Sequence, residues 1–234
     1  HLTGWYDQQI GTIKHFTGMV QNGMTEDARE NQYLVVGPWT HTLENLSQKV
    51  GELDFGTEAE WDFFELAHEW FSCWLAERDT EVGRWPRVRA FVMGVNTWRE
   101  SDTWPLPKTI YRSYYLRSGG HAQSAAGDGS LSCAPPGEEP ADAYVYDPRD
   151  PAMSMYTPEG QHAPVDLRPL DGRRDLLVYT TPPLEEPVEV LGPVVVKLWA
   201  ASSARDTDFV ARLIDVWPNG FTQELCYGIV RARY

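Results

Sequence analysis

Two short sequences each place an ionisable side chain just past a tight turn, and both turns follow residues that could form strands. Gly4-Trp5-Tyr6-Asp7 delivers a carboxylate, and Gly37-Pro38-Trp39-Thr40-His41 delivers an imidazole. The 34 residues that separate Asp7 from His41 are about the length of one helix and one return strand of a βαβ unit. We therefore expect two neighbouring strand ends to bring an acid/base pair together.

The residues between the two turns fit this arrangement. Apolar residues recur every three or four positions in residues 8–22, which predicts a helix with one apolar face. Tyr33–Val36 form a short, continuous apolar run, which is typical of a strand buried on both faces. His41 follows this predicted strand directly.

A longer helix is predicted over residues 58–78. Thr57 and Glu60 have the spacing of a capping box for its start. Its aromatic residues form a wide stripe, so we expect the helix to be buried along much of its surface.

The composition changes after Gly83 to short β-like segments separated by turns, with a stretch of long ordered loops over residues 118–174. The predicted strands are Val88–Met93, Tyr111–Leu116, Leu176–Thr180, Val188–Leu191, Val194–Ala200, Phe209–Val216 and Phe221–Val230. The last two would be joined as a hairpin at Pro218-Asn219-Gly220. We therefore predict an α/β piece over residues 1–83 and an all-β sandwich of jelly-roll type over residues 84–234.

The charge of the chain excludes two classes of partner. The 234 residues carry a formal net charge of −14, and the sequence pI is near 4.8, so the protein repels phosphate backbones and anionic lipid. No apolar run reaches the roughly 20 residues needed to cross a bilayer. We expect a soluble protein that binds neither nucleic acid nor membrane. Its location stays open, with a slight preference for the cytoplasm.

The sequence contains no evident metal site. Cys73, Cys133 and Cys226 lack the spacing of a zinc site, and we interpret them as core or surface thiols. Asp206 and Asp208 resemble a short calcium-binding motif, but arginine partners or solvent are favoured over calcium. The sequence begins without an initiator methionine and stops inside a predicted strand, so we expect it to be cut at both ends.

Short motifs occur in a defined order along nearly the whole chain: Gly4–Asp7, Leu34–His41, Trp70–Leu75, Phe91–Trp98, Trp104-Pro105, Tyr114–Leu116, Tyr146–Pro148, Asp171 with Arg173 and Arg174, Gly192-Pro193, Asp206–Phe209 and Gly228–Tyr234. Each motif alone is weakly specific. As an ordered series they resemble the Xaa-Pro dipeptidyl-peptidase and cocaine esterase family of serine hydrolases, which also holds α-amino acid ester hydrolases and cephalosporin acylases.

The resemblance implies the C-terminal piece of an α/β-hydrolase domain, followed by a jelly-roll β-sandwich that is incomplete at its C-terminus. It also implies a catalytic triad in chain order Ser, Asp, His, with Asp7 as the acid and His41 as the base. None of Ser47, Ser72 or Ser101 lies in a Gly-x-Ser-x-Gly motif, so the nucleophile would belong to a complementary N-terminal segment. We expect the chain alone to be inactive, and no cofactor is implied.

The residues around the two turns also allow simpler interpretations. Trp5, Tyr6 and Trp39 could line an acyl pocket, although a tryptophan beside a turn more often packs in a core. Asp7 could cap the helix that follows it. His41, taken alone, could be a structural or surface histidine.

The leading hypothesis is that the chain is part of a serine hydrolase that cleaves small acyl esters or amides, including peptides. The sequence does not choose among peptide, ester and β-lactam side-chain substrates. The alternative is a non-catalytic β-sandwich that binds a ligand or assembles with another subunit, and a homo-oligomer is compatible with either hypothesis. Metal-dependent hydrolysis through Asp7 and His41 lacks a third ligand.

Overall fold

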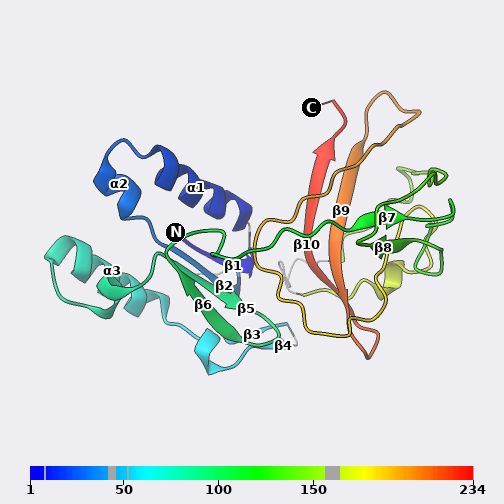
Figure 1. Cartoon of the computed structure of the whole chain (residues 1–234). Coiled ribbons are helices and arrows are strands. Elements are labelled where there is room, and N and C mark those ends of the chain that lie inside the picture. Colours follow the sequence, from blue (N-terminus) through cyan, green and yellow to red (C-terminus); the bar gives the residue numbers. More distant parts are fainter. Residues whose placement is uncertain (8, 42–45, 52, 156–163, 234) are drawn as a thin grey trace. The chain divides into compact units, whose positions relative to one another are not determined.

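The computed structural model describes residues 1–7, 9–41, 46–51, 53–155 and 164–233, which divide into two compact units (Figure 1). The first unit is built on His1–Thr109 with the short segment Leu191–Val194, and the second on Ile110–Met155, Val165–Val190 and Val195–Tyr234. The α-helices of the described residues all belong to the first unit. None of them has the length and apolar character that a membrane span requires.

A four-stranded sheet forms the centre of the first unit. Its strands, in spatial order, are β1 (Leu2–Tyr6), β2 (Leu34–Thr40), β5 (Val88–Val92) and β6 (Thr97–Ser101). Strands β1, β2 and β5 run parallel, and β6 runs antiparallel to β5. The chain passes from β1 to β2 through the helices α1 (Gln9–Asn22) and α2 (Glu26–Glu30). The predicted βαβ order and the predicted first helix are therefore confirmed.

Helix α1 packs on the sheet through its predicted apolar face. Phe16 lies in one cluster with Leu34, Val36 and Val88, and all four side chains are buried. Ile13, nearly one turn before Phe16, also contacts this cluster. Burying a side chain of this size contributes about 1.5–3 kcal/mol. The apolar face thus holds helix α1 against β2 and β5.

Strand β2 is buried on its other face as well, as its continuous apolar run predicts. Val35 and Trp39 pack there with Leu46. The neighbouring segment contains the short strands β3 (Lys49–Val50) and β4 (Leu53–Asp54) and the 3₁₀ turn η1 (Thr57–Ala59). Val50, Phe55 and Ala59 from this segment pack against Tyr6 and Phe91 of the sheet.

The predicted turn after Val36 is wrong, because β2 continues to Thr40. Gly4 of β1 pairs with Gly37 of β2. The next pair in the register joins Tyr6 to Thr40, so β2 holds one residue more than β1 between the two pairs. This β-bulge also accommodates the proline of the strand, which has no backbone N–H to donate to a ladder.

The two strands approach each other closely at the bulge. A Cβ atom on Gly4 would lie 2.0 Å from the carbonyl oxygen of Trp39 and 2.5 Å from its carbonyl carbon. Only glycine leaves room for a backbone at that position. The close packing of β1 against β2 therefore requires glycine at position 4.

Helix α3 (Phe63–Ala76) is shorter than the predicted helix over residues 58–78. It begins after Asp62, whose side chain accepts hydrogen bonds from the amides of Phe64 at 2.8 Å and Glu65 at 3.0 Å, so the predicted capping box at Thr57 is wrong. The predicted burial is also wrong, since no residue of α3 is buried. The helix is amphipathic, but the described residues do not cover most of its apolar stripe, and these side chains are exposed: Phe64, Phe71, Trp74 and Leu75.

The 3₁₀ turn η2 (Glu81–Arg84) connects α3 to β5. Strands β5 and β6 follow residue 83 but belong to the sheet of the first unit. The division into domains at residues 83 and 84 stays a prediction.

The regular elements of the second unit are mainly β-strands, separated by long loops. Its elements are β7 (Tyr115–Arg117), β8 (Ser130–Ser132), the 3₁₀ turn η3 (Arg168–Leu170), β9 (Asp208–Val216) and β10 (Thr222–Arg231). Strands β9 and β10 form the predicted hairpin, and β7 pairs with β8. The strands predicted at residues 188–191 and 194–200 are wrong, because the described backbone there pairs with no other strand and most of its side chains are exposed. Residues 176–180 make only isolated bridges.

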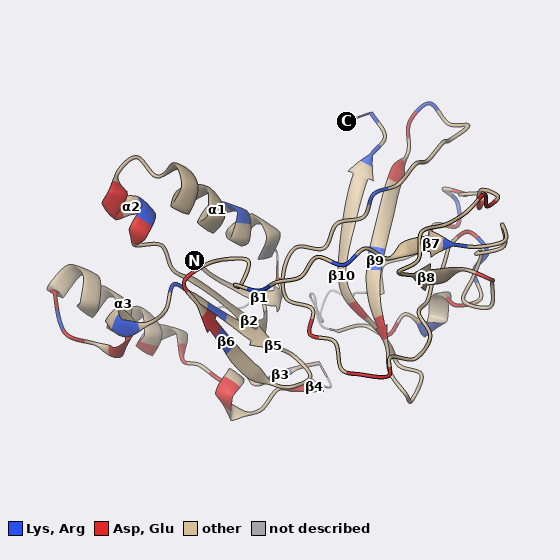
Figure 2. Cartoon of the chain, in the orientation of Figure 1, with Lys and Arg blue, Asp and Glu red and all other residues tan. Residues whose placement is uncertain are grey.

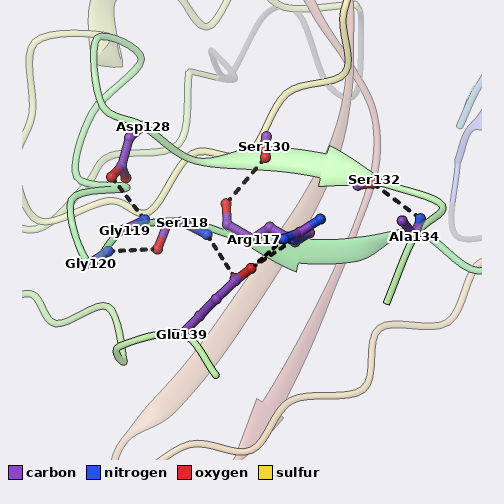
Figure 3. A network of polar contacts seen from close by, with 9 residues as sticks. All are labelled: Arg117, Ser118, Gly119, Gly120, Asp128, Ser130, Ser132, Ala134 and Glu139. Atoms are coloured by element: carbon purple, nitrogen blue, oxygen red, sulfur yellow. Dashed lines mark hydrogen bonds and ion pairs between the residues drawn. The ribbon is translucent and has the colours of Figure 1, made fainter. Parts of the chain in front are cut away.

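Charged side chains tie together the long loops around β7 and β8 (Figure 3). Arg117 forms an ion pair with Glu139 at 2.7 Å, and Glu139 also accepts a hydrogen bond from the Ser118 amide at 3.3 Å. Asp128 accepts a hydrogen bond from the Gly119 amide at 2.9 Å. These carboxylates satisfy backbone groups that lack a ladder partner.

Asp142 accepts a second set of hydrogen bonds in the same loops. Its donors are the Ser118 hydroxyl at 2.5 Å, the Ala122 amide at 2.9 Å and the Tyr179 hydroxyl at 2.7 Å. Burial acts to raise the pKa of Asp142, but these hydrogen bonds outweigh it and hold the pKa below its usual value. Burial and the Asp142 carboxylate raise the pKa of Tyr179, which therefore stays a donor.

The close approach of β1 and β2 predicts that Gly4→Ala destabilises the protein by about 1–3 kcal/mol, because the new Cβ atom meets a backbone oxygen that cannot rotate away. Gly18→Ala is the matched control, since a Cβ atom there meets nothing within 4 Å. The measurement is the midpoint of urea unfolding. A midpoint for Gly4→Ala equal to that of the wild type would contradict the close approach.

Asp142→Asn should lower the free energy of unfolding at neutral pH by about 1–3 kcal/mol, because Ser118 and Tyr179 lose an ionised acceptor. The pKa of Asp142 is lower in the folded state than in the unfolded state. The contribution of the carboxylate is therefore present above about pH 4 and is lost as the pH falls through the folded-state pKa. Urea unfolding at pH 7 and pH 3 should show the difference between wild type and variant shrinking at pH 3. A difference independent of pH contradicts this assignment.

Candidate active site

Asp7 and His41 follow the carboxyl ends of β1 and β2. These two strands are neighbours in the sheet and run parallel (Figure 1). Nδ1 of His41 lies 2.7 Å from Oδ1 of Asp7, a distance typical of a hydrogen bond to an ionised group. The structure thus brings together the two residues that the sequence pattern pairs. Their catalytic role stays a prediction.

The turn after β1 fixes the position of Asp7. The Asp7 amide donates a hydrogen bond to the Gly4 carbonyl at 3.1 Å, and the Thr3 hydroxyl donates one to Oδ2 of Asp7 at 3.4 Å. The side chain of Asp7 is 18% exposed, whereas that of His41 is 67% exposed. The carboxylate is therefore partly removed from water, while the imidazole is accessible.

The hydrogen bond determines what the imidazole can do chemically. An ionised carboxylate only accepts hydrogen bonds, so the neutral ring of His41 carries its proton on Nδ1, and Nε2 keeps its lone pair. When Nε2 takes up a proton, the negative charge of Asp7 stabilises the imidazolium. This is the arrangement of a general base whose tautomer is set by an acidic partner.

Trp5, Tyr6 and Trp39 pack within the first unit. Tyr6 is 5% exposed and Trp39 is 1% exposed. Trp5 is half-buried, and its indole N–H donates a hydrogen bond to the Phe91 carbonyl at 2.6 Å. These are the contacts of packed residues, in line with the simpler interpretation of their positions. A role in lining an acyl pocket stays a prediction.

Sequence reasoning missed a cluster of tryptophans around Trp39. Trp61 and Trp98 stack with ring centroids 4.7 Å apart, and both lie beside Trp39. The guanidinium of Arg89 lies 4.4 Å from the centroid of the Trp85 ring, within the range of a cation–π interaction. The only signal in the sequence is the high content of tryptophan, 10 in 234 residues. The cluster itself depends on the pairing of β5 with β6.

The acidic pair of the second unit has arginine partners, as predicted. Asp208 pairs with Arg231 at 2.7 Å across the β9–β10 hairpin, and Asp206 pairs with Arg233. Figure 2 shows the acidic start of β9 beside the basic end of β10. Within the part of the chain that the structure describes, no three His, Cys, Asp or Glu side chains group as a metal site requires, and the three cysteines are free.

Comparison with known proteins places the chain in a family. The profile of the X-Pro dipeptidyl-peptidase C-terminal non-catalytic domain matches residues 80–234. The chain belongs to this family. The cocaine esterase of Rhodococcus sp. (strain MB1 Bresler) is 41% identical over 99% of this chain, and a putative serine esterase of Mycobacterium bovis is 32% identical over 98%. The chain spans 40% and 34% of the lengths of these two relatives.

Two solved structures resemble this member of the X-Pro dipeptidyl-peptidase family along its length. An aminopeptidase from a marine sediment Thaumarchaeota archaeon has a TM-score of 0.76, and an α-amino acid ester hydrolase has a TM-score of 0.73. Each is 28% identical and covers 99% of this chain, which in turn covers 39% and 40% of those chains. The named relatives are thus esterases, an ester hydrolase and an aminopeptidase. Asp7 and His41 lie before residue 80, outside the family profile but inside the span shared with these hydrolases.

The pairing of Asp7 with His41 predicts a proton resonance of His41 Nδ1–H at unusually low field in the NMR spectrum of protein labelled with ¹⁵N-histidine. Asp7→Ala should remove this resonance, because the acceptor is lost. His15→Ala, which replaces an exposed histidine of α1, is the control and should leave it in place. Persistence of the resonance in Asp7→Ala would mean that another group holds the ring.

Proposed function

We propose that this chain is part of a serine hydrolase of acyl esters or amides, in which Asp7 and His41 are the acid and the base of a Ser-His-Asp triad. The observation that carries the proposal is the 2.7 Å hydrogen bond from His41 Nδ1 to Asp7, formed at the carboxyl ends of adjacent parallel strands. Functional residues of open α/β sheets gather at these ends. The nucleophilic serine belongs to a complementary N-terminal segment that precedes the Asp7 turn, so the chain alone is inactive.

In the proposed mechanism His41 acts first as a base and then as an acid. Nε2 takes the proton of the serine hydroxyl as the serine oxygen attacks the substrate carbonyl carbon. The tetrahedral intermediate then collapses, and the imidazolium gives its proton to the departing alcohol or amine. A water molecule attacks the resulting acyl-enzyme in the same way and releases the acid. Asp7 stays ionised throughout and holds the imidazole in the required tautomer.

The finer architecture is part of the same proposal. Parallel strands β1, β2 and β5 with helix α1 packed on the sheet support an α/β-hydrolase piece, since such domains are built on a mostly parallel sheet covered by helices. The antiparallel β9–β10 hairpin and the family match over residues 80–234 support a β-sandwich of jelly-roll type in the second part. The names of the relatives support ester or peptide substrates without choosing between them.

A second candidate function is a non-catalytic binding or assembly module. The observation that favours it is that two thirds of this chain match a family domain that is non-catalytic. The two proposals differ in what they require of Asp7 and His41. The assembly module does not need the pair, whereas the hydrolase does.

In the protein that joins this chain to the nucleophile-bearing segment, His41→Ala and Asp7→Asn should each lower kcat for p-nitrophenyl ester hydrolysis by about 10⁴-fold. The matched control is His15→Ala, which changes an exposed histidine elsewhere in the first unit and should keep the wild-type rate. Labelling by a fluorophosphonate probe should fall together with kcat. Wild-type kcat in His41→Ala contradicts the hydrolase and favours the assembly module.

A further inference from the structure

We propose that Trp39 is a positioning residue that holds the β2 bulge, and thereby His41, where the imidazole can bond Asp7. This inference rests on the proposed function. Trp39 lies two residues before His41 and is 1% exposed. The His41 side chain is 67% exposed, so packing does little to orient its ring. Among the described residues, the backbone that precedes His41 and the hydrogen bond to Asp7 set the position of the base.

The indole of Trp39 is held from several sides. Its N–H donates a buried hydrogen bond to the Ala59 carbonyl at 2.7 Å. Its ring lies 5.3 Å from that of Trp61 and 5.8 Å from that of Trp98, centroid to centroid. The indole N–H of Trp98 donates a hydrogen bond to the Glu58 carbonyl at 2.9 Å, so the same cluster is bonded twice to the 3₁₀ turn η1. Aromatic pairs at these distances add about 0.5–1.5 kcal/mol each to their burial.

Trp39 in turn contacts both strands at the bulge. Its ring folds back over Gly37, where a Cβ atom would lie 2.4 Å from the indole. Its carbonyl oxygen lies against Gly4 of β1. A displacement of the indole therefore moves the backbone that leads to His41 relative to the turn that carries Asp7. Catalytic groups must be held to within about 0.5 Å of their productive geometry, so such a shift reaches the reacting atoms.

The first test displaces the indole without changing it. Gly37→Ala places a methyl group against the Trp39 ring, whereas Gly18→Ala is the matched control with nothing within 4 Å of its new Cβ atom. In the protein that includes the nucleophile-bearing segment, Gly37→Ala should lower kcat by about 10²-fold with little change in KM. It should also abolish or shift the low-field resonance of the His41 Nδ1–H. The control should leave both unchanged.

Trp39→Phe provides a second test for the case in which Gly37→Ala does not fold. It retains an aromatic ring but removes the N–H that bonds Ala59, and it should weaken the His41 resonance and lower kcat. Its matched control is Trp74→Phe on α3, outside the cluster. A folded Gly37→Ala or Trp39→Phe with the resonance and kcat of its control overturns the proposal. If His41→Ala keeps the wild-type kcat, the hydrolase fails, while the resonance still reports whether Trp39 positions the ring.

Discussion

The parallel pairing of β1 with β2, and the close backbone contact inside it, is the constraint on which the candidate site depends. Parallel strands lie about 4.7–4.9 Å apart and end at the same edge, which brings the residues after them within reach of each other. The extra residue of β2 adds a second condition. Because side chains alternate along a strand, one inserted residue turns every later side chain to the opposite face. The bulge between Gly37 and Thr40 therefore determines toward which face of the sheet the strand directs the residues that lead to His41.

The candidate pair could be predicted from sequence because each part has a local signal. The apolar run before Gly37 specifies a buried strand, the spaced apolar residues of α1 specify a crossover helix, and the distance between the motifs matches one βαβ unit. The bulge could not be predicted in this way. A glycine followed by a proline has the same local pattern in a turn and in a bulged strand. What distinguishes the bulged strand is its contacts with distant residues, namely the pairing with β1 and the hydrogen bond from Trp39 to the Ala59 carbonyl.

The failed predictions of a buried α3 and of strands within residues 188–200 share a physical cause. The stripe of α3 and the apolar residues of 188–200 show that these segments have apolar faces, but a sequence pattern does not say which surface covers a face. In the described residues Leu75 is 77% exposed and Trp199 is 95% exposed. Buried apolar surface is worth about 25 cal/mol per Å², so these faces would gain from a cover. The complementary segment proposed to carry the nucleophile is one candidate, since the relatives are longer than this chain.

A segment covering the site would also change the attraction between the Asp7 carboxylate and the His41 imidazolium. The attraction between a carboxylate and an imidazolium depends inversely on the effective dielectric constant, so a half-open pair at the surface is weaker than the same pair in a closed site. Asp7 is already 18% exposed, whereas His41 is 67% exposed, so most of the remaining screening acts on the imidazole. Closing the site over His41 would strengthen the stabilisation of the imidazolium without moving either residue. The buried Trp39 supplies the geometry in advance, and the cover would supply the low dielectric in which that geometry is effective.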